Sequence, residues 1–317
     1  MIANEGNVVA LAGGVGGAKL AHGLALTGLN ERLRVIVNTA DDFELFGLHI
    51  SPDLDTVLYT LGGIANPETG WGIVGDTFAT LSAIERLGRG NWFSLGDQDL
   101  ATHILRTERL RDGASLTAVT AELAKALKVR ASILPMCDEP VATMIETSAG
   151  ILDFQTYFVR RHHADNVLNV RFSGIENAVP TAETKQAIEQ ASVIVLCPSN
   201  PIVSIGPILS LAGVRDSLID TEIPVVAVSP IIAGQALKGP ADQMLASLGH
   251  EVSAVGVAEI YQDFLSGMII DDQDAALASR IETFGVAVHV TGTIMRSEAD
   301  RLRLAKETLE FAERLRR

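Results

Sequence analysis

Short apolar runs alternate with polar or glycine-rich turns and with segments of helical spacing. Residues 8–12 form an apolar run that ends in the glycines of residues 13–17, and residues 18–26 then place apolar side chains at helical intervals. A second apolar run covers residues 33–37. A strand, a helix and a strand within about thirty residues predict two parallel strands joined by a right-handed crossover.

The same alternation returns in the second half. Residues 187–190 end a helical segment before the apolar run 193–196, and residues 225–228 form another such run. Strands that are apolar at every position are typical of a parallel sheet covered on both faces. The chain is therefore predicted to be an α/β protein with a Rossmann-like parallel sheet flanked by helices.

Between these halves the pattern changes toward helices. Helices are predicted over residues 77–87, 99–107 and 116–127, and a β-hairpin over residues 144–154. We expect residues 62–165 to be an inserted subdomain that contributes to the substrate site, and residues 1–61 and 166–317 to form the nucleotide-binding core. The core closes with a charged amphipathic helix over residues 297–315.

Composition narrows the possible partners. Hydrophobic residues make up 47% of the chain and charged residues 20%, within the globular range. The net charge of -14 disfavours nucleic acid and anionic membranes, although helix N-termini can still bind phosphate. The polar, acidic residues 1–7 and the lack of a long apolar run lead us to expect a cytoplasmic protein without a membrane span.

The first glycine-rich turn is a candidate phosphate site. It follows a strand and opens a helix, so backbone N–H groups and the positive helix end would face an anion. Lys19 replaces the third glycine of the dinucleotide fingerprint, and no Ser or Thr follows it as in a P-loop. The competing interpretation is a tight turn that packs helix against strand.

Four carboxylates follow the second strand closely: Asp41, Asp42, Asp53 and Asp55. The carboxyl edge of a parallel sheet is where ligands bind, and carboxylates with substrate phosphates are typical magnesium ligands. Asp53 could instead be the N-cap of the next helix.

A third polar loop follows the strand at residues 193–196. Residues 197–207 are rich in proline and small polar residues, which suits nucleotide contacts but also suits a stiff structural turn. Among the histidines, His103 follows two carboxylates, and we interpret it as a satisfied helix residue rather than a catalytic one.

Together these loops resemble one family, the 2-phospho-L-lactate transferases of coenzyme F420 biosynthesis, also called CofD or FbiA. The resemblance runs over nearly the whole chain, and several separate motifs carry it in order. These are GGVGGAKL (13–20), NTADD (38–42), ISPDLDTVLY (50–59), WG (71–72), LGDQDLATHILR (95–106), RDGASL (111–116), residues 133–136, residues 198–208 and VAEIYQDF (257–264).

The resemblance implies a Mg²⁺-dependent transfer of a phospho-acid from a guanosine diphosphate-linked donor to the terminal hydroxyl of the deazaflavin Fo, with release of GMP. Asp41 and Asp55 would then be catalytic and hold the metal, and Asp55 with Gln98 would contact Fo. The family usually has arginine at the place of Gln98, where this chain has a neutral amide instead of a charged group. The nucleotide would be bound by Gly13, Gly14, Gly16, Gly17, Lys19, Ser199, Asn200, Ser204 and Gly206.

Several points stay open at the level of sequence. A homodimer is expected from the resemblance alone, and the acid on the donor is phospholactyl, phosphoenolpyruvyl or phosphoglyceryl. One alternative is a YvcK-like nucleotide-sugar-binding regulatory protein, which shares the glycine loop. Another is a nicotinamide oxidoreductase in which Asp41 binds a ribose.

Overall fold

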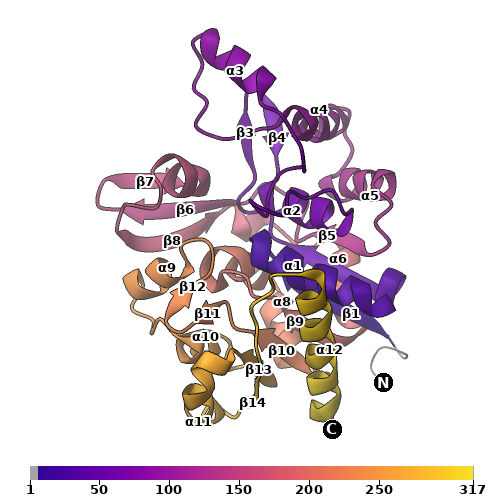
Figure 1. Cartoon of the computed structure of the whole chain (residues 1–317), viewed down its shortest axis with the longest axis vertical. Coiled ribbons are helices and arrows are strands. Elements are labelled where there is room, and N and C mark those ends of the chain that lie inside the picture. Colours follow the sequence, from indigo (N-terminus) through magenta and orange to yellow (C-terminus); the bar gives the residue numbers. More distant parts are fainter. Residues whose placement is uncertain (1–5, 317) are drawn as a thin grey trace.

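A parallel sheet of seven strands forms the centre of the computed structural model, which describes residues 6–316 (Figure 1). All its pairings are parallel. The polar start of the chain lies mostly outside the described residues. In spatial order the strands are β14 (Ala287–Val290), β13 (Gly267–Ile270), β10 (Val225–Val228), β9 (Ala191–Leu196), β1 (Asn7–Ala12), β2 (Leu33–Val37) and β5 (Ser132–Pro135).

Strand β1 shows why the sheet is covered on both faces. Val8, Ala10 and Ala12 belong to one apolar cluster, while Val9 and Leu11 belong to another, because successive side chains point to opposite faces. The first cluster packs against α1 (Gly14–Leu24), α2 (Pro52–Leu61), α5 (Leu116–Ala126) and α12 (Glu298–Leu315). The second packs against α6 (Ala182–Glu189), α7 (Gly206–Ser210), α8 (Val214–Ile219), α10 (Ala254–Tyr261) and α11 (Ala278–Glu282). The predicted α/β sheet is confirmed.

The strand order reverses between β1 and β9. From β1 the chain moves through β2 to β5 on one side, and from β9 it moves through β10 and β13 to β14 on the other. The loops after β1 and β9 therefore diverge at the carboxyl edge, which is where open α/β sheets bind ligands.

Smaller elements extend from this edge (Figure 1). A hairpin of β3 (Phe43–Leu45) and β4 (Leu48–Ile50) lies beside α4 (Asp97–Arg111), and α3 (Ala79–Arg86) projects above them. The predicted hairpin is present as β6 (Ala142–Thr147) and β7 (Gly150–Asp153), and β8 (Val167–Ser173) adds a third antiparallel strand. A further pair, β11 (Ile231–Ile232) and β12 (Gln235–Ala236), precedes α9 (Ala241–Ser247).

Two strands fall across the expected subdomain limits. β5 lies within residues 62–165 but pairs with β2 in the main sheet, and β8 lies beyond residue 165 but pairs with β6. Residues 62–165 are thus not separate from the central sheet. Across residues 6–316, no helix is both long enough and apolar enough to cross a bilayer.

Candidate active site at the carboxyl edge of the sheet

The loops that follow β1 and β9 are bound to each other. The backbone N–H of Gly13 donates to Ser199 Oγ (3.1 Å), and that hydroxyl donates to the carbonyl oxygen of Gly13 (2.9 Å). Ser199 thus fixes the position of the glycine turn instead of lining a cleft. This pairing places the N-terminus of α1 at the switch point.

Close packing explains most of the glycines. A Cβ at Gly16 would overlap the carbonyl oxygen of Pro198, and one at Gly17 would lie 2.5 Å from Ser199 Oγ. Gly13 is equally confined, by Asp53 and Ser204, and Gly14 has a φ of 61°. The structural interpretation of the glycines therefore holds, and a binding role depends on what the first turn of α1 faces.

On one side of that turn lies a cleft of about 350 Å³, which we call the cationic cleft. Its positive residues are Lys19, Lys238 and Arg296, and its polar residues include Asn200 and Thr293. Lys19 Nζ donates to the carbonyl oxygen of Met295 (3.1 Å). Burial, together with Arg301 and Lys238, lowers the pKa of Lys19. Three cations in one cleft of a chain with net charge -14 favour an anionic ligand.

On the other side of the turn lies a larger cleft of about 560 Å³, which we call the aromatic cleft. Val15 lines both clefts, so the first turn of α1 forms the wall between them. Rings and carboxylates dominate the lining of the aromatic cleft. They include Trp71, Trp92, Phe93, Phe154 and Phe158, with the carboxylates Asp41, Asp53, Asp55 and Asp99.

Asp41 and Asp53 share one hydrogen-bond donor. Asn38 Nδ2 donates to Asp41 Oδ2 (3.1 Å) and to Asp53 Oδ2 (3.0 Å). Burial, and then the charge of Asp53, raises the pKa of Asp41 well above its ordinary value. Burial raises the pKa of Asp53 to about 6. Two buried carboxylates this close favour a cation or a proton between them.

Asp53 is not the N-cap of α2, contrary to the alternative considered from sequence. Ser51 holds the N-cap position and Pro52 begins the helix. Asp53 Oδ1 instead accepts the N–H of Gly14 (2.8 Å), which joins α2 to the start of α1.

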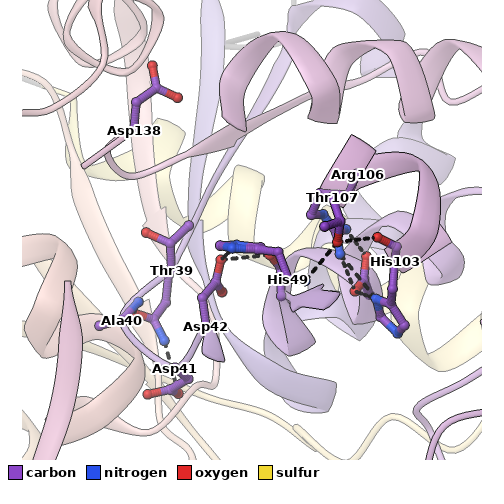
Figure 2. Close-up of polar contacts among 12 residues, drawn as sticks. Thr39, Ala40, Asp41, Asp42, His49, His103, Arg106, Thr107 and Asp138 are labelled. Carbon is purple, nitrogen blue, oxygen red and sulfur yellow. Dashed lines mark hydrogen bonds and ion pairs between the residues drawn. The ribbon is translucent and has the colours of Figure 1, made fainter. Parts of the chain in front are cut away.

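The neighbouring carboxylates of the NTADD motif point to different partners. Asp42 Oδ2 accepts from Ser51 Oγ (2.6 Å) and lies 3.0 Å from His49 Nε2. Figure 2 shows the Asp42 carboxylate turned toward His49, with Asp41 lying apart from it. Asp41 therefore belongs to the cleft, whereas Asp42 braces the β3–β4 hairpin.

The residues present fit a hard cation at Asp41. Asp41 Oδ1 is buried and has no well-formed hydrogen bond within the described part of the chain, although the Thr143 hydroxyl lies near the Asp41 carboxylate. Both oxygens of Asp55 accept from Arg106, and each carboxylate oxygen keeps a second lone pair. Asp41 and Asp55 are hence both able to contribute a metal ligand.

Sequence reasoning missed the partners of Asp55. Arg106 on α4 is 1% exposed and binds Asp55 with both terminal nitrogens. His103 is a buried residue of α4 with Asp55 and Asp99 as neighbours, as expected of a satisfied helix histidine, but it also lines the aromatic cleft, which the sequence did not indicate. Asp99, His103 and Arg106 are spaced by four and three residues, the spacing of one helix face, and this pattern was a usable signal.

The other residues predicted to bind the nucleotide or Fo lie in different parts of the structure. Asn200 lines the cationic cleft, and its Oδ1 also accepts the N–H of Ile202 (2.9 Å). Ser204 and Gly206 lie behind the glycine turn and are not among the described residues that line either cleft. Gln98 is exposed and lines neither cleft, so its position does not support a contact with the acceptor.

Comparisons with known proteins give the chain its family. The family model described as 2-phospho-L-lactate transferase CofD matches residues 8–305. The 2-phospho-L-lactate transferase of Methanosarcina mazei is 42% identical over 94% of this chain and 98% of its own. The phosphoenolpyruvate transferase of Streptomyces coelicolor is 40% identical over 98% of this chain and 99% of its own.

A solved structure supports the fold independently. A UPF0052 family protein from Bacillus halodurans superimposes with a TM-score of 0.64 over 96% of this chain and 99% of its own, at 15% identity. At that identity the likeness concerns the fold alone. The sequence relatives, by contrast, have transferase names, which argues against a nicotinamide oxidoreductase. On the match over residues 8–305 and these relatives, the chain belongs to the CofD family of 2-phospho-L-lactate transferases.

Proposed function

We propose that this chain transfers a phospho-acid from a guanosine diphosphate-linked donor to the terminal hydroxyl of Fo, releasing GMP, in coenzyme F420 biosynthesis. The observation that carries the proposal is the pair of clefts on either side of Val15. One cleft is cationic and the other is aromatic. The carboxylates line the aromatic cleft, beside the turn of α1 that separates the two clefts.

The donor is assigned to the cationic cleft. Its diphosphate and acid group are negatively charged, and Lys19, Lys238 and Arg296 would neutralise them. The N-terminus of α1 adds partial positive charge at the wall. The phosphorus that carries the acid would then lie next to the aromatic cleft.

The acceptor is assigned to the aromatic cleft. A deazaflavin is a large planar ring system, and offset or edge contacts with Trp71, Trp92 and Phe158 would hold it. Its ribityl chain would extend toward Asp55. The acceptor hydroxyl oxygen would then bond to the acid-bearing phosphorus as the bond from that phosphorus to the GMP oxygen breaks.

Asp41 and Asp55 are the residues that would hold Mg²⁺. A bound magnesium ion supplies charge neutralisation at the diphosphate, which is the main requirement of phosphoryl-type transfer. The carboxylate of Asp55 would accept the proton of the attacking hydroxyl. Positioning and charge neutralisation are then sufficient, and no covalent intermediate on the protein is needed.

Mass spectrometry tests this function. The purified protein is incubated with Fo, magnesium and a guanosine diphosphate-linked lactate, enolpyruvate or glycerate donor, with and without EDTA. We expect GMP and one phosphodiester product, both lost with EDTA. Binding of UDP-sugars without product from any donor would instead favour the YvcK-like regulatory alternative.

We also propose that the protein works in the cytoplasm as a homodimer, as expected from the family resemblance. Light scattering at assay concentration checks the assembly, and a monomer with full activity would contradict it.

A further inference from the structure

Arg106 is the largest fully buried side chain among the described residues. Its Nη1 donates to Asp55 Oδ2 (3.0 Å), and its Nη2 donates to Asp55 Oδ1. A planar fork of this kind fixes both the position and the plane of a carboxylate. Asp55 is thereby prevented from rotating.

His103 contacts the same nitrogen of Arg106 as Asp55 does. Arg106 Nη1 lies 3.3 Å from His103 Nδ1, and His103 Nε2 lies 3.2 Å from Asp99 Oδ1. Since the guanidinium has no acceptor, Nδ1 must be the accepting nitrogen and the proton belongs on Nε2, facing Asp99. The imidazole is then neutral and joins two groups that differ in charge.

The far end of this chain of contacts is also fixed. Tyr59 Oη donates to Asp99 Oδ1 (2.7 Å), and the N–H of Asp99 donates to Asp76 Oδ2 (3.0 Å). The contacts run from Tyr59 through Asp99, His103 and Arg106 to Asp55. They form a rigid support beneath the carboxylate in the aromatic cleft.

We propose that Arg106, held by His103, is a positioning residue that fixes the Asp55 carboxylate in its reactive orientation. The inference rests on the role of Asp55 in the proposed function. Arg106 engages one lone pair on each oxygen, which leaves a second lone pair on each, and Asp55 lines the aromatic cleft. Arg106 acts through Asp55 and needs no contact with either substrate.

A metal ion in this network is the competing interpretation. Oxygen and nitrogen atoms of Asp55, Asp99 and His103 lie within 4.8 Å of one another. The guanidinium of Arg106, however, contacts both Asp55 and His103, so a cation held among Asp55, Asp99 and His103 would lie against its charge. The geometry points instead to a network that is centred on the guanidinium of Arg106 and supports Asp55.

The first test compares two arginines of the same helix. Arg106→Lys keeps the charge but removes the fork, and we expect kcat to fall about 100-fold, since small misplacements of reacting groups have effects of that order. Donor affinity by calorimetry and the Tm should stay close to wild type. Arg109→Lys is the control, because Arg109 forms a similar fork with Glu122 on the exposed surface.

A second pair of variants tests the role of His103 even if Arg106→Lys fails to fold. His103→Asn keeps an acceptor near the position of Nδ1, whereas His103→Leu removes it. We expect His103→Asn to retain most of kcat and His103→Leu to lose it at unchanged donor KM. Equal kcat in these two variants, or a folded Arg106→Lys with wild-type kcat, would overturn the inference. Lack of transfer by the wild type would refute the proposed function instead.

Discussion

At the scale of single residues, the site gathers carboxylates that would repel one another without a ligand. Asp41 and Asp53 are buried and meet at one amide of Asn38. Burial raises the pKa of both carboxyls, so keeping them ionised at neutral pH costs folding free energy. Such a cost is typical of active sites, where charge is placed for chemistry at the expense of stability.

The variant Asp41→Asn separates the cost in stability from the contribution to activity. The neutral amide removes the buried charge, so we expect the Tm of the metal-free protein to rise. We expect activity to fall by at least about 100-fold because charge neutralisation at the diphosphate is lost. Thermal unfolding in EDTA and initial rates in magnesium provide the two readouts, and a lower Tm with normal turnover would contradict both expectations.

The same carboxylates make the stability of the metal-free protein depend on pH. The pKa of Asp53 is raised from 3.8 to about 6, so its contribution to stability is present below pH 3.8 and is lost as pH rises through 6. Asp41, whose pKa is also raised, acts in the same direction. We therefore expect the Tm in EDTA to fall between about pH 4 and pH 6, and to fall less in the Asp41→Asn variant.

The site residues that could be predicted from sequence were those that directly follow a strand. Asp41 and the glycines could be predicted because a strand end fixes their place at the carboxyl edge. Arg106 could not be assigned to Asp55, since 51 residues separate the two and a lone arginine on a helix is usually exposed. The helix-face spacing of His103 and Arg106 indicated that they share a face, but not what that face contacts.

At the scale of elements, four strands of the central sheet were recognised from sequence, whereas the equally buried β13 and the mostly exposed β8 were not. β1, β2, β9 and β10 are buried at nearly every position, and each was predicted within two residues of its bounds. β8 buries Val167 and leaves most of its remaining side chains exposed or half-exposed, so its sequence lacks a core pattern. β5 has four residues and ends in Pro135, which reads as a turn.

The junction of β1, α1 and the loop after β9 is the element-scale feature on which the proposed donor binding depends. Gly16→Ala would press a methyl group against the carbonyl oxygen of Pro198 and separate the two loops. Overpacking of this kind costs about 1 to 3 kcal/mol, so we expect a Tm lower by several degrees and weaker donor binding. Calorimetry with GDP measures the change in binding.

Gly90→Ala is the matched control. Its added Cβ would lie 3.7 Å from Trp92 Cδ1, an ordinary contact, and Gly90 has no positive φ. Equal GDP affinity and Tm in both variants would show that the junction tolerates a side chain.

At the scale of the whole molecule, two ligand environments lie on either side of one helix turn. The cationic cleft uses residues from the C-terminal half, such as Lys238 and Arg296, with Gly16 and Lys19 from α1. The aromatic cleft uses the β3–β4 region, α4 and the segment after β7. The central sheet brings these distant segments together at its carboxyl edge (Figure 1).

Intrinsic fluorescence should distinguish the two clefts. Both tryptophans of the chain, Trp71 and Trp92, line the aromatic cleft. We expect Fo to quench tryptophan emission on titration, and GDP to leave it nearly unchanged. A Trp71→Phe variant should keep part of the quenching through Trp92, whereas strong quenching by GDP alone would contradict the assignment of the clefts.

Direct transfer requires donor and Fo to be bound at once, on either side of the first turn of α1. The initial rate of GMP release, measured with donor and Fo varied together, tests this requirement. Direct transfer predicts intersecting double-reciprocal lines and no GMP release from the donor without Fo. Parallel lines, with one equivalent of GMP released per enzyme before Fo is added, would contradict it.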